Sequence, residues 1–159
     1  GMGLDARIGT RFLQAGLGFG GSCFPKDLSA FIHISSELGY DFRLLKEVQQ
    51  INAEQMDRFF KKLTDTLWVL KDKLVGVLGL AFKQNTDDVR TSPAIELCQR
   101  LVKEGARLRV FDPQAMEKAQ ALLPAGPQLE YVPSQDAVPE GCDALAFTED
   151  TPPSGEVRS

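Results

Sequence analysis

The sequence contains a continuous apolar run, Leu74-Val75-Gly76-Val77-Leu78-Gly79-Leu80-Ala81-Phe82. Strands that are buried on both faces of a parallel sheet have such uninterrupted apolar patterns. A helix is predicted next, from about Ser92 to Glu104, because Pro93 stands near its start and Gly105 at its end. A buried strand followed by a helix begins a β-α-β unit, so the run predicts a parallel sheet that is covered by helices.

The same alternation continues downstream. A second strand is predicted over Arg107–Phe111, a helix over Gln114–Leu123 and a short strand near Leu129–Val132. A brief helical turn then precedes a last strand at Asp143–Phe147. Successive β-α-β units form right-handed crossovers, so the expected fold class is α/β with a Rossmann-like parallel sheet. Residues 151–159 are rich in Pro, Ser and Gly, and we expect them to form a disordered tail.

Helices precede this sheet. One is expected from Phe24 to about Leu38, with Pro25 in its first turn and a stop at Gly39. A second, from about Phe42 to Leu70, carries apolar residues three and four positions apart and would be roughly 40 Å long. Such length favours a connection between two domains that also packs against a partner chain, with a simple core helix as the alternative. A short helical piece is expected around Asp5–Leu13.

Composition argues against several classes of protein. The chain has 159 residues, with 18 Lys and Arg against 22 Asp and Glu, which is typical of a globular domain. This mild acidity argues against a nucleic-acid partner, and no apolar run approaches the ~20 residues that span a membrane. No charged-then-apolar leader opens the chain, so we expect a cytoplasmic protein. The single histidine, His33, lies in an apolar helical stretch and is expected to be partly buried.

The three cysteines differ in their setting. Their odd number and wide spacing argue against a disulfide framework and a zinc site, so no metal is expected. Cys23 lies at the entrance of a predicted helix, with Lys26 and Asp27 in the next turn, and both the helix end and the ammonium favour a thiolate. Cys23 is therefore a candidate nucleophile, with a small buried thiol in a capping turn as the alternative. Cys98 and Cys142 are interpreted as packing residues.

Two loops carry the remaining candidate chemistry. Gly16 to Gly21 formally match G-x-G-x-x-G, but no convincing strand precedes them, so the match is weak as a dinucleotide-binding turn. These glycines are expected instead to let the backbone approach a ligand or adopt positive φ. The second loop, residues 79–93, follows the first predicted strand, where open α/β sheets bind ligands. Lys83 and Arg90 suit phosphates there, with a solvated charged loop as the alternative.

Both loops match a known family. Gly18-Phe19-Gly20-Gly21-Ser22-Cys23-Phe24-Pro25-Lys26-Asp27 and Gly79-Leu80-Ala81-Phe82-Lys83-Gln84-Asn85-Thr86-Asp87-Asp88-Val89-Arg90 closely resemble the UDP-glucose 6-dehydrogenases of the UDP-glucose/GDP-mannose dehydrogenase family. The resemblance covers about Gly3 to Asp150. It implies that residues 3–70 belong to a central helical dimerisation domain with a catalytic cysteine loop. It also implies that residues 71–150 form an incomplete, Rossmann-like UDP-binding domain.

The resemblance implies a specific chemistry, the oxidation of UDP-glucose to UDP-glucuronate by NAD through a thiohemiacetal and then a thioester on a cysteine. Cys23 matches that nucleophile, and Asp27 matches an aspartate that assists the water and the proton transfers. Lys26 matches a lysine near the NAD phosphates, and Arg90 matches an arginine that reaches NAD. The substrate-binding matches are Phe12, Leu13, Gln14, Ala15, Gly16, Phe19, Gly20, Phe82, Lys83 and, across a dimer interface, Arg7.

This sequence also differs from the family pattern, because the family begins with a domain that these residues do not contain. The resemblance implies a homodimer through the long helix, but the family's amino-terminal NAD domain has no counterpart in these residues. We therefore expect the 159 residues to be a fragment that is inactive alone. Two alternatives are another nucleotide-sugar dehydrogenase, such as one of the GDP-mannose type, and a non-catalytic module that binds a nucleotide sugar or dimerises.

Overall fold

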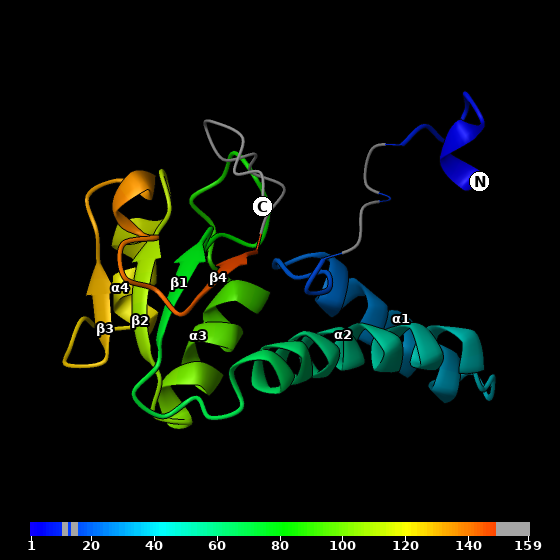
Figure 1. Ribbon diagram of the computed structural model, residues 1–159. Helices are drawn as coiled ribbons and strands as arrows, with labels where there is room; N and C mark the ends of the chain where they lie inside the picture. The colour runs from blue at the N-terminus through cyan, green and yellow to red at the C-terminus, as the bar shows by residue number, and fades with distance from the viewer. Residues whose placement is uncertain (11–12, 14–15, 149–159) are drawn as a thin grey trace.

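A parallel sheet forms the carboxyl-terminal half of the protein in the computed structural model, which describes residues 1–10, 13 and 16–148 (Figure 1). Within these residues the sheet has four strands: β1 (Leu74–Leu78), β2 (Arg107–Phe111), β3 (Leu129–Tyr131) and β4 (Ala144–Phe147). Their order is β3-β2-β1-β4, and every neighbouring pair is parallel. The predicted α/β class and parallel sheet are thereby confirmed.

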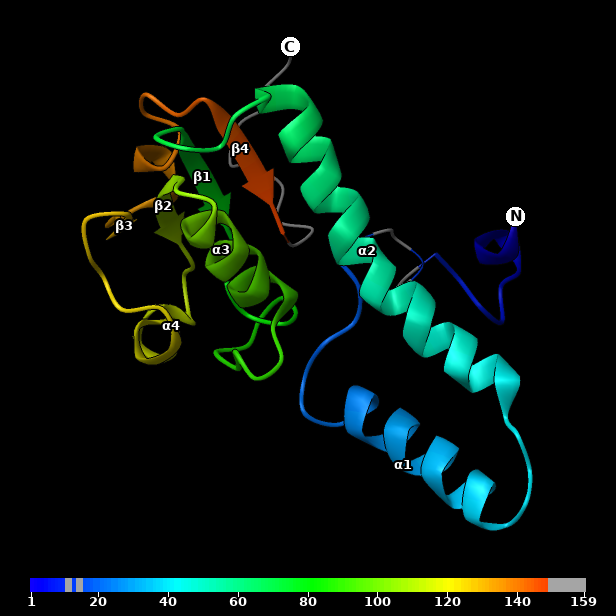
Figure 2. The same cartoon turned by 90° about the horizontal axis from the view of Figure 1, so that it is seen from below.

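Helices α3 (Pro93–Lys103) and α4 (Met116–Leu122) connect the first three strands and lie on one side of the sheet (Figure 2). The other side is covered by the segment that holds the short 3-10 helix η2 (Gln135–Ala137). A Cβ atom at Gly76 of β1 would lie 2.7 Å from Val138 Cγ1 of this segment and 2.5 Å from Leu145 Cδ2 of β4. The glycine in β1 therefore lets the η2 segment approach the sheet closely.

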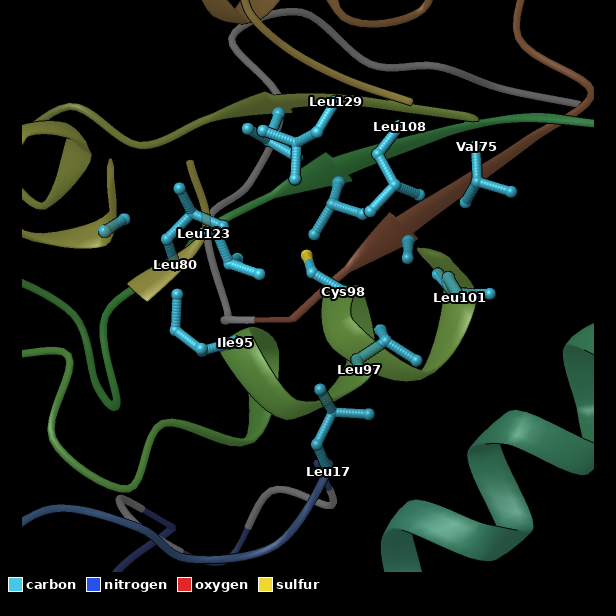
Figure 3. Packing of buried hydrophobic residues seen from close by; sticks show 14 of the residues in the cluster. Leu17, Val75, Leu80, Ile95, Leu97, Cys98, Leu101, Leu108, Leu123 and Leu129 are labelled. Atoms are coloured by element: carbon cyan, nitrogen blue, oxygen red, sulfur yellow. The ribbon is translucent and has the colours of Figure 1, made fainter. Parts of the chain in front are cut away.

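The core lies between α3 and the sheet (Figure 3). Leu97, Cys98 and Leu101 of α3 have no exposed surface, and Val75 of β1 and Leu108 of β2 are equally buried. Burying a leucine side chain contributes about 1.5–3 kcal/mol, so α3 is the helix that holds the sheet domain together. Burial also raises the pKa of the Cys98 thiol to about 12, which keeps it neutral. The interpretation of Cys98 as a packing residue is correct.

The amino-terminal half is a helical hairpin of α1 (Phe24–Glu37) and α2 (Arg43–Leu67), which lie side by side (Figure 2). Gly39, with φ +78°, ends the first helix where the sequence predicts the stop. At 1.5 Å per residue, α2 is about 37 Å long. Its buried residues Met56 and Leu63 belong to the same core cluster as α3.

Several local predictions need correction. The apolar run leaves the sheet at Gly79, with φ +95°, so β1 is shorter than the predicted strand. In place of a helix around Asp5–Leu13, the described residues form a short 3-10 helix, η1 (Met2–Leu4), and a turn at Asp5. His33 is not partly buried, since its side chain is 74% exposed and lies 3.4 Å from Glu37. No helix among the described residues combines the length and apolar character needed to cross a bilayer.

Candidate functional site

Cys23 is the exposed member of the three cysteines. It is the N-cap residue of α1, whose first turn contains Pro25 and Asp27, and its Sγ lies 3.7 Å from Ser22 Oγ. Cys98 is buried, and Cys142 is half-buried and donates a hydrogen bond to the carbonyl oxygen of Val138. The alternative of a buried thiol at Cys23 is therefore wrong, and the accessible sulfur is the one at the positive end of a helix.

The glycine loop before Cys23 is fastened to α2. The side-chain amide of Asn52 accepts a hydrogen bond from the Phe19 amide at 2.7 Å and donates one to the Phe19 carbonyl oxygen at 3.1 Å. The Phe19 ring also contacts the edge of Phe24 at a centroid distance of 4.7 Å. Gly18, at φ +111°, and Gly21, at φ +84°, occupy the left-handed region that favours glycine. These contacts hold the loop in one conformation over the start of α1.

The structure brings the two predicted loops together. A Cβ atom at Gly21 would lie 2.6 Å from the Phe82 ring, and one at Gly20 would collide with the carbonyl oxygen of Thr91. The hydroxyl of Thr91 donates a hydrogen bond to the Gly21 carbonyl oxygen. Glycine is needed at these positions because the loop before Cys23 packs directly against the loop that follows β1.

Asp112 holds the loop that follows β1 in place. This carboxylate is 3% exposed, and its Oδ2 accepts hydrogen bonds from the amides of Leu80 and Ala81. Its Oδ1 accepts two more from the amides of Gln114 and Ala115 at the start of the next connection. Four main-chain donors satisfy the buried carboxylate, so Asp112 joins the carboxyl ends of β1 and β2.

Ser92 completes this support from the other end of the loop. Its buried hydroxyl lies within hydrogen-bond distance of the carbonyl oxygens of Leu80 and Ala81. The sequence analysis assigned no function to Ser92 or Asp112. An Asp-Pro pair directly after a predicted strand was the available signal for Asp112, because such a side chain can bond to the backbone amides that follow.

Charged side chains surround the contact between the loops. Three hydrogen bonds, of 2.7 to 3.1 Å, join the Arg90 guanidinium to the Asp88 carboxylate and lower the pKa of Asp88 to about 2. The hydrogen bond with Asp88 raises the pKa of Arg90 in turn, so both groups stay charged at neutral pH. Asp87 pairs with Lys118 of α4 at 2.6 Å.

Comparison with known proteins identifies the family. The model described as "UDP-glucose/GDP-mannose dehydrogenase family, UDP binding domain" matches residues 76–153, and that described as the family's "central domain" matches residues 1–54. The chain belongs to the UDP-glucose/GDP-mannose dehydrogenase family. The family oxidises nucleotide sugars with NAD, and its UDP-binding domain contains the four strands described above.

Relatives within the family cover nearly all of the chain. The UDP-glucose 6-dehydrogenase TuaD of Bacillus subtilis is 43% identical over 99% of this chain and 34% of its own length. The UDP-glucose 6-dehydrogenase of Pseudomonas aeruginosa is 41% identical over 92% of this chain and 33% of its own length. The chain thus spans about a third of the length of the curated relatives it matches.

Solved structures from the family have the same fold. A UDP-glucose dehydrogenase from Pyrobaculum islandicum matches with a TM-score of 0.84 and 45% identity, over 94% of this chain and 34% of that one. A GDP-mannose dehydrogenase from Pseudomonas aeruginosa matches with a TM-score of 0.74 and 29% identity, over 92% of this chain and 35% of that one. The resemblance stated from the sequence is confirmed at the level of the family.

The fold gathers some of the family-derived candidates and separates others. Lys26 and Asp27 follow Cys23 in the first turn of α1, with exposed side chains 3.9 Å apart. Lys83 extends over the Phe82 ring, 5.3 Å from its centroid, on the loop beside Gly21. Phe19 and Gly20 belong to the loop before Cys23, and Arg90 belongs to the loop that follows β1.

The candidates nearest the amino terminus lie elsewhere. Arg7 pairs with Asp5 at 2.7 Å in an exposed segment that lies apart from α1 in both views (Figures 1 and 2). Leu13 is exposed, and so is Gly16. Phe12, Gln14 and Ala15 lie outside the described residues. Within the described part of the chain, Arg7 is therefore not brought together with Cys23.

Proposed function

We propose that the chain is the cysteine-bearing and UDP-binding portion of a UDP-glucose 6-dehydrogenase, which oxidises UDP-glucose to UDP-glucuronate. The observation that carries this proposal is the difference between two solved relatives. The UDP-glucose dehydrogenase shares 45% of its aligned residues with this chain, against 29% for the GDP-mannose dehydrogenase. A UDP-sugar is accordingly the proposed substrate, and a GDP-sugar is the competing outcome of the test below.

Cys23 is the proposed nucleophile. Its thiolate adds to the C6 aldehyde formed in the first oxidation, which gives a thiohemiacetal whose oxidation leaves a thioester. Water then hydrolyses the thioester, releases the carboxylate and restores the thiol. The support is local: Cys23 is exposed and is the N-cap residue at the positive end of α1. Asp27, one turn further along the exposed side of α1, is proposed to hold the attacking water and accept its proton.

NAD supplies the hydride acceptor of both oxidations when it is bound. The residues described here fit an outer contact with its phosphates: Lys26 has an exposed ammonium, and Arg90 a guanidinium that keeps exposed surface while it pairs with Asp88. The glycines before Cys23 follow no strand among the described residues, so they do not form a dinucleotide-binding turn. We therefore propose that these 159 residues alone bind UDP but do not turn over.

The nucleotide sugar is proposed to bind where the two loops meet, at the carboxyl end of β1. Lys83 supplies a cation for the diphosphate, and Phe82, Phe19 and Gly20 form the adjoining wall. The proposed sugar-binding stretch 12–16 lies directly before this wall in the sequence. Arg7, which is exposed and distant from Cys23 within one chain, is proposed to serve the site of a second copy.

A chimera tests the proposed chemistry, with this chain in place of the matching third of the Bacillus subtilis relative. We expect it to reduce two NAD per UDP-glucose. In Cys23→Ser we expect the rate of UDP-glucuronate formation to fall by about 10³-fold or more. Cys142→Ser is the matched control and should retain both reductions. UDP-glucuronate formation at the normal rate in Cys23→Ser would refute the assignment of Cys23 as the nucleophile. Activity with GDP-mannose but not with UDP-glucose would refute the proposed substrate.

A further inference from the structure

Thr91 makes a hydrogen bond between the two loops of the site. Its Oγ1 lies 2.5 Å from the carbonyl oxygen of Gly21, which is 70 positions away in the sequence. The same hydroxyl lies 2.8 Å from the carbonyl oxygen of Arg90, so its proton is shared between two acceptors. Gly21 stands two residues before Cys23. A bond that fixes the Gly21 carbonyl therefore also fixes the chain that leads into α1.

Thr91 is exposed, but the backbone around it is held in place by its neighbours. Its backbone has φ +45°, an unusual conformation for a β-branched residue. Val89 and Ser92 on either side are buried, and α3 begins at Pro93. This arrangement aims the hydroxyl at the glycine loop.

The packed contact between the two loops has one open side. A groove of about 340 Å³ lies between α2 and α3, and its lining includes Phe19, Thr91 and Pro93. On that side the contact between the loops is open. Thr91 therefore lies at the border between this groove and the packed contact of Gly21 with the Phe82 ring.

We propose that Thr91 is a positioning residue for Cys23. The hydroxyl of Thr91 holds the glycine loop against the loop after β1 and so places the Cys23 thiol at the start of α1. This inference rests on the proposed nucleophilic function of Cys23. In the fixed position Cys23 is the N-cap residue of α1, at the positive end of the helix, where a nucleophilic sulfur is favoured. Without the hydroxyl the loop moves more freely and spends less time in that position.

The rate of alkylation at each cysteine tests this in the 159-residue chain itself. Wild type, Thr91→Val and Thr91→Ser are treated with iodoacetamide at pH 7, and labelling is followed by peptide mass spectrometry. Thr91→Val keeps the shape and β-branching but removes the hydroxyl, and we expect Cys23 to react about fivefold more slowly. Thr91→Ser keeps the hydroxyl and should react within about twofold of wild type. Cys142 provides an internal control, because its thiol bonds to Val138 and should react equally in all three proteins.

Two results would overturn the proposal: an unchanged Cys23 rate in Thr91→Val, or an equal loss in Thr91→Ser. Labelling of the buried Cys98 would show that Thr91→Val has unfolded. In that event Gly20→Ala tests the same contact, since its Cβ collides with the Thr91 carbonyl oxygen and should slow Cys23 similarly. A normal rate there would also overturn the proposal. Calorimetry with UDP on the wild-type chain tests the proposed function separately, because absence of UDP binding leaves the alkylation comparison intact.

Discussion

Individual polar side chains, rather than apolar ones, determine how the site is assembled. Asn52 replaces a main-chain partner for Phe19, and Asp112 accepts four main-chain amides at the ends of two strands. Thr91 then connects the loops that these two residues hold. The bonds of Asn52 and Thr91 join segments far apart in the sequence, so spacing along the chain does not reveal them, whereas the Asp-Pro pair after a predicted strand was a signal for Asp112. The position of Cys23 at a helix start could be predicted because that signal is local, whereas only the family resemblance pointed to Phe82, Lys83 and Arg90 across the loop contact.

The pair of Asp88 and Arg90 gives a test at a single residue. Arg90 holds the pKa of Asp88 at about 2, below the ordinary 3.8, so the pair stabilises the fold above about pH 4 and this contribution is lost as the pH falls toward 2. In Arg90→Gln the pKa of Asp88 should rise toward 3.8, although the amide of residue 90 still donates to the carboxylate. Carboxyl NMR titration measures this change. Arg58→Gln, which removes an exposed pair with Glu54, is the control and should leave the pKa of Asp88 at about 2. An unchanged pKa of Asp88 in Arg90→Gln would contradict the proposed effect of the Arg90 guanidinium.

At the level of elements, the sequence predicted every strand and main helix of the sheet domain, with boundaries that differ by a few residues. Apolar periodicity, together with Pro93 and Gly105 at the ends of α3, was sufficient because these signals are local. The strand order was beyond reach, since no local pattern shows that β4 returns to pair with β1. The predicted burial of His33 was wrong because no element packs on that side of α1 among the described residues.

Gly76 tests the packing between β1 and the η2 segment. Gly76→Ala would place a Cβ atom within 2.7 Å of Val138 and Leu145 side chains, so we expect it to lower the free energy of unfolding by about 1–3 kcal/mol. Urea unfolding followed by circular dichroism measures the difference. Gly126→Ala is the matched control, because no atom lies within 4 Å of its added Cβ, and it should change stability much less. Equal stabilities of the two variants would show that the η2 segment yields without cost.

For the whole molecule, the helical hairpin leaves apolar side chains exposed. Phe24, Phe31 and Ile34 of α1 and its C-cap residue Leu38 are 53–80% exposed and share one face of the helix, three, four and seven positions apart. We propose that a second copy of the chain covers this face, whereas the family resemblance implies a dimer through the long helix α2. The long helix α2 contributes Leu44 and Ile51 to the exposed apolar surface.

The oligomeric state of the chain in solution tests whether the apolar face of α1 is a dimer interface. Multi-angle light scattering should give a mass near twice 17.5 kDa for the wild-type chain. Ile34→Glu places a charge on the apolar face and should shift the mass toward the monomer, whereas Ser36→Glu, on the opposite side of α1, should not. A monomeric wild type at every concentration would refute the interface, and a dimeric Ile34→Glu would exclude α1 from it.

The strand order also has a consequence for synthesis on the ribosome. The central strand β1 pairs with β4, whose first residue, Ala144, is registered with Val75. When β1, β2 and β3 have all left the exit tunnel, one side of β1 still carries unpaired amides and carbonyls, and these attract other extended chains. Translation must proceed through Phe147 before that side is closed. Early termination between Tyr131 and Ala144 would therefore yield a nascent chain in which β1 lacks its partner β4, and chaperones would need to shield that unpaired edge.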